Sequence, residues 1–221
     1  MQQSSYQPRV LNETEKRIRE VALRLFAQKG FEATSTREIA AEAGLTVAGL
    51  YYYVGTKEEL LLHIVLDISN ALLRSAVSIS AGNDSAEQKL ARLVQLHVWF
   101  HGAYAQASRV VDIEIRALTG EAREQAQRIR DQYEAEWRSA VAQGNAAGVF
   151  EGQDAKLAAI ALIEMGRGIS HWYNPHGNLS LPDICHMYVD WALGLLRATR
   201  DGKPLRASDL NLGNPAELYL A

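Results

Sequence analysis

Apolar residues recur at three- and four-residue intervals along most of this chain. The first such segment carries a stripe made of Ile18, Val21, Ala22, Leu25 and Phe26. This i, i+3, i+4, i+7, i+8 spacing indicates a helix with one buried face. Because Gly30 follows the stripe and can end the helix, we predict a first helix over 13–29.

Capping signals divide the next segment into two short helices. Ser35 and Glu38 have the spacing of a capping box, so a helix should begin there and end near Gly44. Thr46 offers a further N-cap. After it we predict a helix of about two turns over 47–53, with an inward-facing leucine.

The same periodicity predicts six further helices downstream. Thr56 and Glu59 form a second capping box before the first of them, and Ser180 caps the last. Their approximate ranges are 57–80, 86–104, 108–118, 121–146, 155–173 and 181–198. No run of alternating β-branched residues is long enough to form a sheet. The sequence therefore predicts an all-α protein of about nine helices.

Composition and charge set limits on this picture. With 221 residues, 48% of them hydrophobic, the chain can bury a sizeable core. The net charge of −3 is unevenly distributed, because residues 1–57 hold eight Lys or Arg and six Asp or Glu, a net +2. The remainder holds 15 and 20, a net −5. A mildly positive N-terminal part permits a DNA partner without indicating one by itself.

Residues 34–60 have the pattern of a helix-turn-helix unit. Two short predicted helices are joined by a Gly-containing turn, with hydroxyls and tyrosines where a duplex backbone could be gripped. Such a unit can place its second helix in a major groove. The pattern predicts a DNA-binding protein.

The segment also resembles the DNA-binding domain of the TetR family of transcriptional regulators, over roughly the first quarter of the chain. The matching motifs are Gly30-Phe31, Thr34-Ser35, Arg37-Glu38-Ile39-Ala40, Ala43-Gly44-Leu45-Thr46, Leu50-Tyr51 and Lys57-Glu58. The resemblance implies phosphate contacts from Thr34, Arg37, Tyr51, Tyr53 and Lys57. It implies contacts near the base edges from Thr46, Val47, Gly49 and Tyr52.

Three positions depart from that family pattern. Val54 replaces the usual Phe, Val47 stands where Lys or Arg is common, and Ala48 stands where Gly or Pro is common. Position 47 therefore has no long donor for bidentate contact with guanine, so we expect apolar contact with a thymine methyl group there.

Three regions follow from these patterns. We predict an N-terminal arm with the helix-turn-helix domain over 1–56, a helical effector-binding and dimerisation domain over 57–200, and a tail over 201–221. The first eleven residues are either a loose terminus or an arm that reaches the DNA backbone through Arg9. The tail has two Pro and few apolar anchors, so we expect it to be mobile.

The last two predicted helices are too apolar for one small body to cover on all sides. Gly166 and Gly168 also allow close backbone approach. Two copies packed as a four-helix bundle would bury the excess, so we predict a homodimer, and the TetR resemblance implies the same arrangement. Two recognition helices about 34–36 Å apart, or a multiple of this, would then read a palindromic operator. The alternative is that these helices form the core of a monomer.

Polar and aromatic residues at helical positions of the body are candidates for contact with a small effector. They are Trp99, His101, Tyr104, Glu114, Tyr133, Trp137, Glu164, Arg167, His171 and Trp172. Glu164 and Arg167 lie three residues apart on the most apolar helix. They form either an internal or interfacial ion pair, or an anchor for a polar group of an effector in an apolar pocket.

One stretch bears on the identity of that effector. Residues 168–181, GISHWYNPHGNLSL, resemble the C-terminal region of TetR-family repressors that control lipid and sterol breakdown. The effectors of that subgroup are acyl-CoA thioesters, so the resemblance implies an acyl-CoA or related lipid metabolite.

The middle of the body is locally basic. Its arginines form either a solvated face or a contact for the phosphates of a nucleotide-bearing ligand, and they are Arg109, Arg116, Arg123, Arg128 and Arg130.

Other classes of function have weaker support. His97 and His101 have the i, i+4 spacing of a helical metal pair that Glu114 could complete, which makes a small helical metalloenzyme the rival hypothesis. We predict no metal and no cofactor, because the aromatic residues between the two histidines favour packing. We find no Gly-x-Ser-x-Gly motif or P-loop, so we predict no enzyme. The single cysteine, Cys185, is expected to pack as a small hydrophobe rather than to sense redox.

The leading prediction is a ligand-responsive repressor that a small effector releases from a double-stranded operator. A second rival is a helix-turn-helix interaction module that has lost DNA binding. The N-terminus has no apolar signal region and no stretch approaches eighteen apolar residues, so we expect a cytoplasmic protein with no membrane partner.

Overall fold

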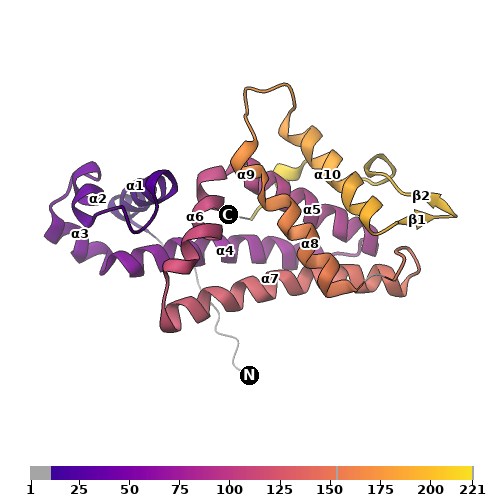
Figure 1. Cartoon of the computed structure of the whole chain (residues 1–221), viewed down its shortest axis with the longest axis horizontal. Coiled ribbons are helices and arrows are strands. Elements are labelled where there is room, and N and C mark those ends of the chain that lie inside the picture. The colour runs from indigo at the N-terminus through magenta and orange to yellow at the C-terminus, as the bar shows by residue number, and fades with distance from the viewer. Residues whose placement is uncertain (1–10, 153, 221) are drawn as a thin grey trace. The chain divides into compact units, whose positions relative to one another are not determined.

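The computed structural model describes residues 11–152 and 154–220 (Figure 1). It confirms the all-α class. Within the described residues, the only strands form a small hairpin near the C-terminus. Two compact units divide the chain: the first holds residues up to 70 together with 109–129, and the second holds 71–108 and 130 onward. The predicted boundary at residue 56 differs from this division, because it assigns residues 57–70 and 109–129 to the effector-binding domain rather than to the first unit.

The first unit contains the three predicted N-terminal helices. They are α1 (Glu13–Lys29), α2 (Thr36–Glu42) and α3 (Val47–Val54). Leu60 and Leu61, at the start of α4 (Lys57–Ala81), share one hydrophobic core with these helices and with residues of 110–126. The predicted stripe on α1 forms part of that core.

Each predicted cap of the first unit is present as hydrogen bonds. The Ser35 hydroxyl accepts from the backbone N–H of Glu38 at 3.2 Å, and the Glu38 carboxylate accepts in return from the backbone N–H of Ser35 at 2.9 Å. Thr56 and Glu59 form the corresponding pair at the start of α4, at 2.7 and 3.1 Å. Local side-chain chemistry therefore decides where these helices begin.

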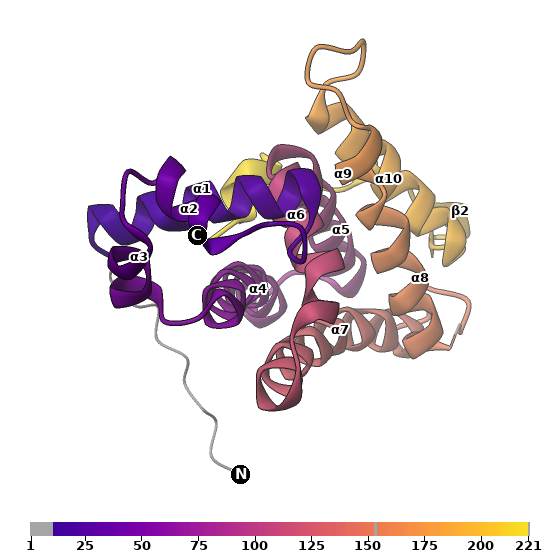
Figure 2. The ribbon, with the colours of Figure 1, turned by 60° about the vertical axis from the view of Figure 1, so that its left-hand side comes forward.

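The second unit is arranged around α5 (Ala86–Ala103). Residues of α8 (Ala155–Arg167), α9 (Ile169–Trp172) and α10 (Leu181–Leu195) pack against it. Figure 2 shows α8 and α10 beside one another, joined by a loop that extends past their ends. Between α5 and α8 the chain forms α6 (Ala105–Ile113), a short 3-10 helix over Glu114–Ala117, and α7 (Gly120–Ala146).

The predicted helix over 155–173 is divided in two. It breaks at Gly168, which separates α8 from the single turn α9. The apolar periodicity continues through the break, so the pattern of buried positions alone does not reveal it. Glycine lowers helix stability by about 1 kcal/mol relative to alanine, and its position is the sequence signal for this boundary.

The C-terminal segment is anchored, so the expectation of few anchors is wrong for the described residues. A hairpin of β1 (Thr199–Arg200) and β2 (Lys203–Pro204) turns at Asp201-Gly202, both with positive φ, as the tight hairpin turn requires. Two 3-10 helices follow, over Ala207–Asp209 and Pro215–Leu218. Buried anchors along this segment are Leu205, Ala207, Leu212 and Pro215.

Tyr219 is the main aromatic anchor of this segment. Its ring centroid lies 5.3 Å from that of Phe100, 5.4 Å from that of Tyr104 and 6.1 Å from that of Trp99. Burial raises the pKa of the Tyr219 hydroxyl to about 12. The backbone N–H of Leu220 then donates to the hydroxyl of Ser75 at 2.8 Å, so the segment closes over α5 and the end of α4.

Helix α4 differs from expectation in its hydropathy. By length and composition it could cross a membrane, whereas the sequence analysis found no stretch of that kind. In this structure 61% of its most apolar window is buried. A core helix has this property, so its apolar composition is accounted for by packing within the protein.

We expect Tyr219→Ala to lower the free energy of unfolding by about 1 to 3 kcal/mol, because three ring contacts are lost. Denaturant unfolding measures this change. Tyr52→Ala is the matched control, since that side chain is 84% exposed. It should change stability by less than about 0.5 kcal/mol. Equal effects of the two substitutions would show that the C-terminal segment does not stabilise the fold.

Candidate DNA-binding surface

Helix α3 buries one residue and presents tyrosines to solvent. Leu50 is 1% exposed and lies in the core of the first unit, whereas Tyr52 is 84% exposed and Tyr51 is also exposed. The Tyr52 and Tyr53 rings meet edge to face at 5.2 Å. An exposed helix face with large amphipathic side chains is suited to contact with another molecule.

A glycine turn and a threonine cap define the start of α3. Gly44 has a φ of +69°, which a side chain would disfavour, and the Thr46 hydroxyl accepts from the backbone N–H of Gly49 at 3.0 Å. A Cβ built at Gly49 would lie 3.2 Å from that hydroxyl oxygen, which is a tight contact. The absence of a side chain at 49 therefore leaves room for the Thr46 cap.

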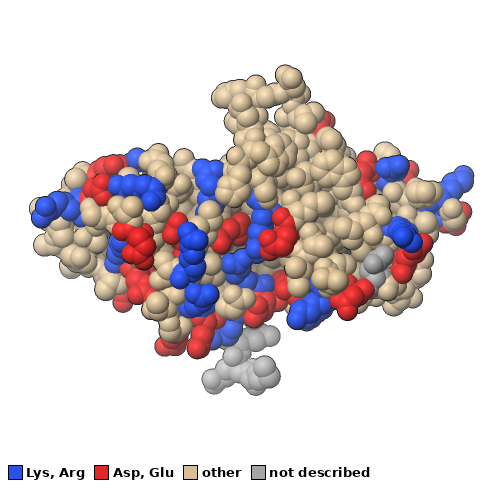
Figure 3. Space-filling model, viewed as in Figure 1, with Lys and Arg blue, Asp and Glu red and all other residues tan. Residues whose placement is uncertain are grey.

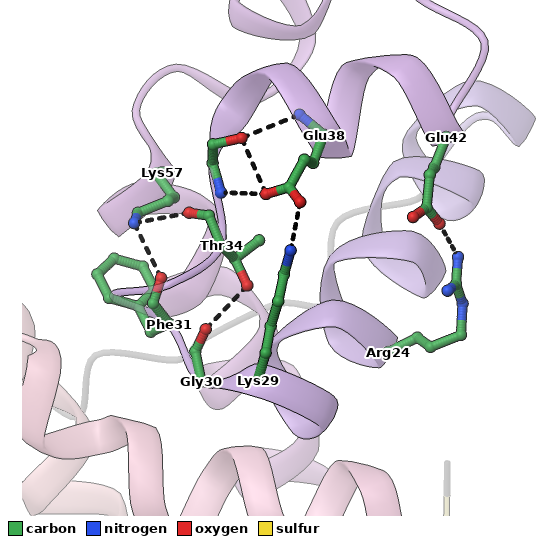
Figure 4. A network of polar contacts seen from close by, with 9 residues as sticks. Arg24, Lys29, Gly30, Phe31, Thr34, Glu38, Glu42 and Lys57 are labelled. Atoms are coloured by element: carbon green, nitrogen blue, oxygen red, sulfur yellow. Dashed lines mark hydrogen bonds and ion pairs between the residues drawn. The ribbon is translucent and has the colours of Figure 1, made fainter.

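Lys57 organises the turn between α1 and α2, as Figure 4 shows. Its ammonium group donates to the carbonyl oxygens of Phe31 at 2.9 Å and Thr34 at 3.0 Å, and it lies 4.1 Å from the centre of the Phe31 ring. An ammonium group has three donors. Two are used inside the domain, which leaves one for a phosphate.

Thr34 is buried. Its hydroxyl donates to the carbonyl oxygen of Gly30 at 2.8 Å, and its side chain is almost fully covered. This side chain shapes the turn and is not presented to a phosphate. We therefore remove Thr34 from the set of side chains proposed to reach DNA.

Most basic side chains around α2 are paired within the domain. Lys29 pairs with Glu38, and Arg24 pairs with Glu42 (Figure 4). The hydrogen bonds from Lys29 and Ser35 lower the pKa of the Glu38 carboxyl to about 2. Arg37 is exposed and makes no ion pair with any residue that the structure describes. Its charge is therefore available for a phosphate.

Two predicted contact residues are partly committed to the core. Val47 and Tyr53 pack against the core cluster with part of their surface. Tyr51 donates to the Thr36 hydroxyl at a long 3.5 Å. Thr46 is exposed at the start of α3. The proposed N-terminal arm with Arg9 lies outside the described residues.

The residues predicted to bind an effector do not gather into one set. His97, which was singled out only for the metal hypothesis, lies at the centre of one cluster. Its ring centroid is 4.1 Å from that of His101, 5.9 Å from that of Tyr133 and 5.5 Å from that of Trp137. A second cluster contains Trp99 and Tyr104, which lie against Tyr219 of the C-terminal segment. That long-range contact has no signal in the local sequence.

Both ring nitrogens of His97 are used. Nε2 lies 3.0 Å from the carbonyl oxygen of Ile163, and Nδ1 lies 3.1 Å from the Tyr133 hydroxyl. Because a carbonyl can only accept, Nε2 carries the proton and Nδ1 accepts from Tyr133. Burial, with the nearby charges of His101 and Arg167, holds the pKa of His97 well below its usual value of 6.5. The ring is therefore a neutral part of the core.

Of the remaining candidates, Arg167 lies close enough to His97 to lower the pKa of that ring. It forms an ion pair with Glu164 on α8, in which the side chain of Arg167 is 28% exposed and that of Glu164 is 56% exposed, so the pair is only partly internal. His171 and Trp172 are exposed on α9. Glu114 belongs to the first unit and lies near Gly30, where a Cβ would be 3.7 Å from its carboxylate.

The rival chemistries gain no support from the geometry. No group of three or more His, Cys, Asp or Glu with a metal-binding arrangement occurs among residues 11–152 and 154–220. Burial raises the pKa of the Cys185 thiol to about 12, so almost no thiolate forms near neutral pH. Of the mid-body arginines, Arg128 lies 3.8 Å from Glu124, and Arg123 donates to the carbonyl oxygen of Arg116 at 3.4 Å.

These features define a helix-turn-helix DNA-binding unit joined to a larger helical domain. Residues 18–64 match the family model described as bacterial regulatory proteins, tetR family. Residues 83–196 match the model described as the tetracyclin repressor-like C-terminal domain. The chain belongs to the tetR family of transcriptional regulators, as the sequence resemblance predicted.

Two curated relatives differ in how far they match. The uncharacterized HTH-type transcriptional regulator YuxN of Bacillus subtilis strain 168 is 39% identical over 75 residues, which cover 34% of this chain and only 26% of YuxN. The HTH-type transcriptional repressor KstR2 of Mycobacterium tuberculosis strain H37Rv is 28% identical over 183 residues, which cover 79% of this chain and 88% of KstR2. The similarity to KstR2 therefore extends into the second unit.

Solved structures share the fold of most of this chain. A bacterial regulatory protein in the tetR family from Rhodococcus RHA1 has a TM-score of 0.80 and 29% identity, covering 86% of this chain and all of that one. AibR, solved in complex with isovaleryl coenzyme A and operator DNA, has a TM-score of 0.75 and 26% identity, covering 81% and 97%. Proteins of this fold thus include one seen with both DNA and an acyl-CoA.

We expect the stability of this protein to fall as the pH is lowered below 6.5, partly through His97. The unfolded chain takes up a proton on this ring in that range, whereas the folded chain, with its depressed pKa, does not. His97→Gln should make the free energy of unfolding less dependent on pH. Urea unfolding at about pH 7.5 and about pH 5.5 measures this dependence. An unchanged pH dependence in the variant would contradict the assignment of a neutral buried ring.

Proposed function

We propose that this protein is a ligand-responsive repressor that binds a palindromic operator as a homodimer in the cytoplasm. The observation that carries the DNA-binding part is the capped α3, which buries Leu50 and exposes Tyr51 and Tyr52 beside a glycine at its N-terminal end. A helix of this kind after a tight turn is the part of a helix-turn-helix unit that enters a major groove.

The contacts are proposed to divide into two kinds. Arg37, Tyr51, Tyr53 and the remaining donor of Lys57 would hold phosphates, while Thr46, Val47, Gly49 and Tyr52 would lie nearest the base edges. Phosphate contacts position the protein, and base contacts select the sequence. Since several basic residues of the domain are already paired with carboxylates, few charges remain for phosphates. Each phosphate contact that does form releases counterions, so we expect operator binding to weaken steeply as the salt concentration rises.

The homodimer is supported by the outer faces of α8 and α10. Leu157 is 67% exposed and Trp191 is 50% exposed, and both are large apolar side chains. On α10, Met187 and Leu195 flank Trp191 at four-residue spacing and are also exposed. A second copy packed on this face would cover the row, and two-fold symmetry lets the same patch serve both subunits.

The effector is proposed to be an acyl-CoA thioester or a related lipid metabolite. Support comes from the resemblance of residues 168–181 to repressors of lipid breakdown and from the fold shared with AibR, which was solved with isovaleryl coenzyme A. Binding in the second unit would shift α4, which runs from one unit into the other, and so alter the spacing of the two DNA-binding domains. A coupling of about 1 to 3 kcal/mol between effector and operator would be enough for a switch.

Operator binding is tested first by footprinting upstream of the protein's own gene. With the protected sequence in hand, we expect Arg37→Gln to weaken binding to operator and unrelated duplex alike, and to lower the slope of log affinity against log salt by about one. Arg138→Gln is the matched control, because Arg138 is an exposed arginine on α7 with no proposed contact. Identical slopes for both variants would remove Arg37 from the phosphate contacts. Absence of any duplex binding would leave an interaction module.

The effector is tested by titrating isovaleryl-CoA and longer acyl-CoA thioesters into the protein bound to its labelled operator. We expect at least one thioester to weaken operator binding about 5- to 150-fold, and the same thioester to bind more weakly to the DNA complex by the same factor. Free coenzyme A and the matching free acid are the controls. If the protein binds its operator but no thioester and no control compound releases it, the acyl-CoA assignment is contradicted. The repressor assignment would still stand.

A further inference from the structure

One segment of the second unit extends away from the helices and carries no charge. Residues 168–182, here called the arm, comprise Gly168, α9, the loop 173–180 and the first two residues of α10. The arm contains no Lys, Arg, Asp or Glu, although 22% of the chain is charged and a stretch of this length would average about three such residues. Figures 1 and 2 show the loop projecting past the ends of α8 and α10, and its surface is tan in Figure 3.

The arm is held in shape at both ends. At its start, Ile169 is fully buried and the Ser170 hydroxyl donates to the carbonyl oxygen of Arg167 at 3.0 Å. In the loop, Asn174 accepts two hydrogen bonds. Its side-chain oxygen accepts from the backbone N–H of His176, and its backbone carbonyl accepts from the backbone N–H of Gly177. At the other end of the arm, Ser180 caps the N-terminus of α10. An arm ordered in advance loses little entropy on binding.

The arm presents large apolar side chains that the single chain leaves uncovered. Trp172 is 53% exposed and Leu179 is 47% exposed. Burial raises the pKa of the Tyr188 hydroxyl and the nearby Trp172 side chain opposes this shift, and the Tyr188 ring centroid lies 4.8 Å from that of Trp191. The aromatic surface of the arm is therefore continuous with the exposed row on α10 that the proposed homodimer would cover.

The absence of charge decides between possible partners. A nucleic acid or an anionic membrane surface is met with Lys and Arg, and the arm has neither. A second copy of the chain brings the same uncharged surface to a two-fold interface, so no like charges of the two arms meet there. Continuity with the α8 and α10 face points to the same occupant.

We propose that the arm clasps the second copy of this chain, with Trp172 and Leu179 buried against the partner in the dimer. This inference rests on the proposed homodimer and adds to it a contact outside the four-helix bundle. The arm then contributes to affinity between subunits, and each subunit completes the surface of the other.

The test is sedimentation equilibrium of the full chain carrying single substitutions. We expect Leu179→Ser and Trp172→Ala each to raise the dimer dissociation constant tenfold or more. Val77→Ser is the matched control, because Val77 is 46% exposed on α4, away from the arm in sequence, and should leave the constant within twofold. Far-ultraviolet circular dichroism and thermal unfolding show that each variant is folded. Leu179→Ser keeps the proposal testable if Trp172→Ala disturbs the neighbouring residues of α10.

Trp191→Asp separates failure of the arm from failure of the dimer. If Trp191→Asp yields a monomer while Leu179→Ser and Trp172→Ala match wild type, the dimer stands and the arm proposal is overturned. If Trp191→Asp has no effect, the proposed dimer face is wrong. A photo-crosslinking amino acid at position 179 gives an independent readout. We expect a crosslinked dimer on a denaturing gel, and crosslinks only within one chain would overturn the proposal.

Discussion

The DNA-binding part of this protein depends on the burial of a single leucine. Helix α3 has eight residues, too few to be stable alone in water, because a short helix does not recover the cost of its nucleation. Leu50 inserts into the core of the first unit, and Thr46 and Gly55 define the two ends. Leu50 is the one buried residue of α3, and Val47, Tyr53 and Val54 pack only in part, so the face that carries Tyr51 and Tyr52 remains free for contact. The same constraint explains why Tyr52 can be almost fully exposed.

The polar side chains around α2 stabilise the conformation of the domain as well as offering contacts to DNA. Lys57 and Thr34 fix the turn before α2 by hydrogen bonds to backbone carbonyls, and paired carboxylates occupy Lys29 and Arg24. In the second unit, His97 plays a comparable structural role, since its two nitrogens satisfy Tyr133 and Ile163 inside the core. Buried polar groups of this kind favour one arrangement of neighbouring helices, because any other arrangement leaves a donor or acceptor unpaired.

The elements that could be predicted from the sequence are those that short-range chemistry defines. The capping pairs at Ser35 and Thr56 gave correct helix starts, and the apolar spacing gave the buried stripe of α1. The candidate effector residues were harder to place. Helical spacing says which residues share a face of one helix, but it does not say which helices become neighbours. Trp99 and Tyr104 were therefore assigned to a site with His101 and Trp137, whereas Tyr219, more than a hundred residues away, lies against them instead.

The sequence by itself determined the all-α class, the helix-turn-helix unit and the family, because caps, turn glycines and periodicity act between residues a few positions apart. Only the tertiary structure decided that Thr34 is buried, that Lys57 is bound to the turn and that the C-terminal segment packs on α5. It also decided which apolar residues of α8 and α10 stay uncovered. These outcomes depend on burial between distant parts of the chain, where the favourable energy comes from surfaces that meet only once the helices are packed.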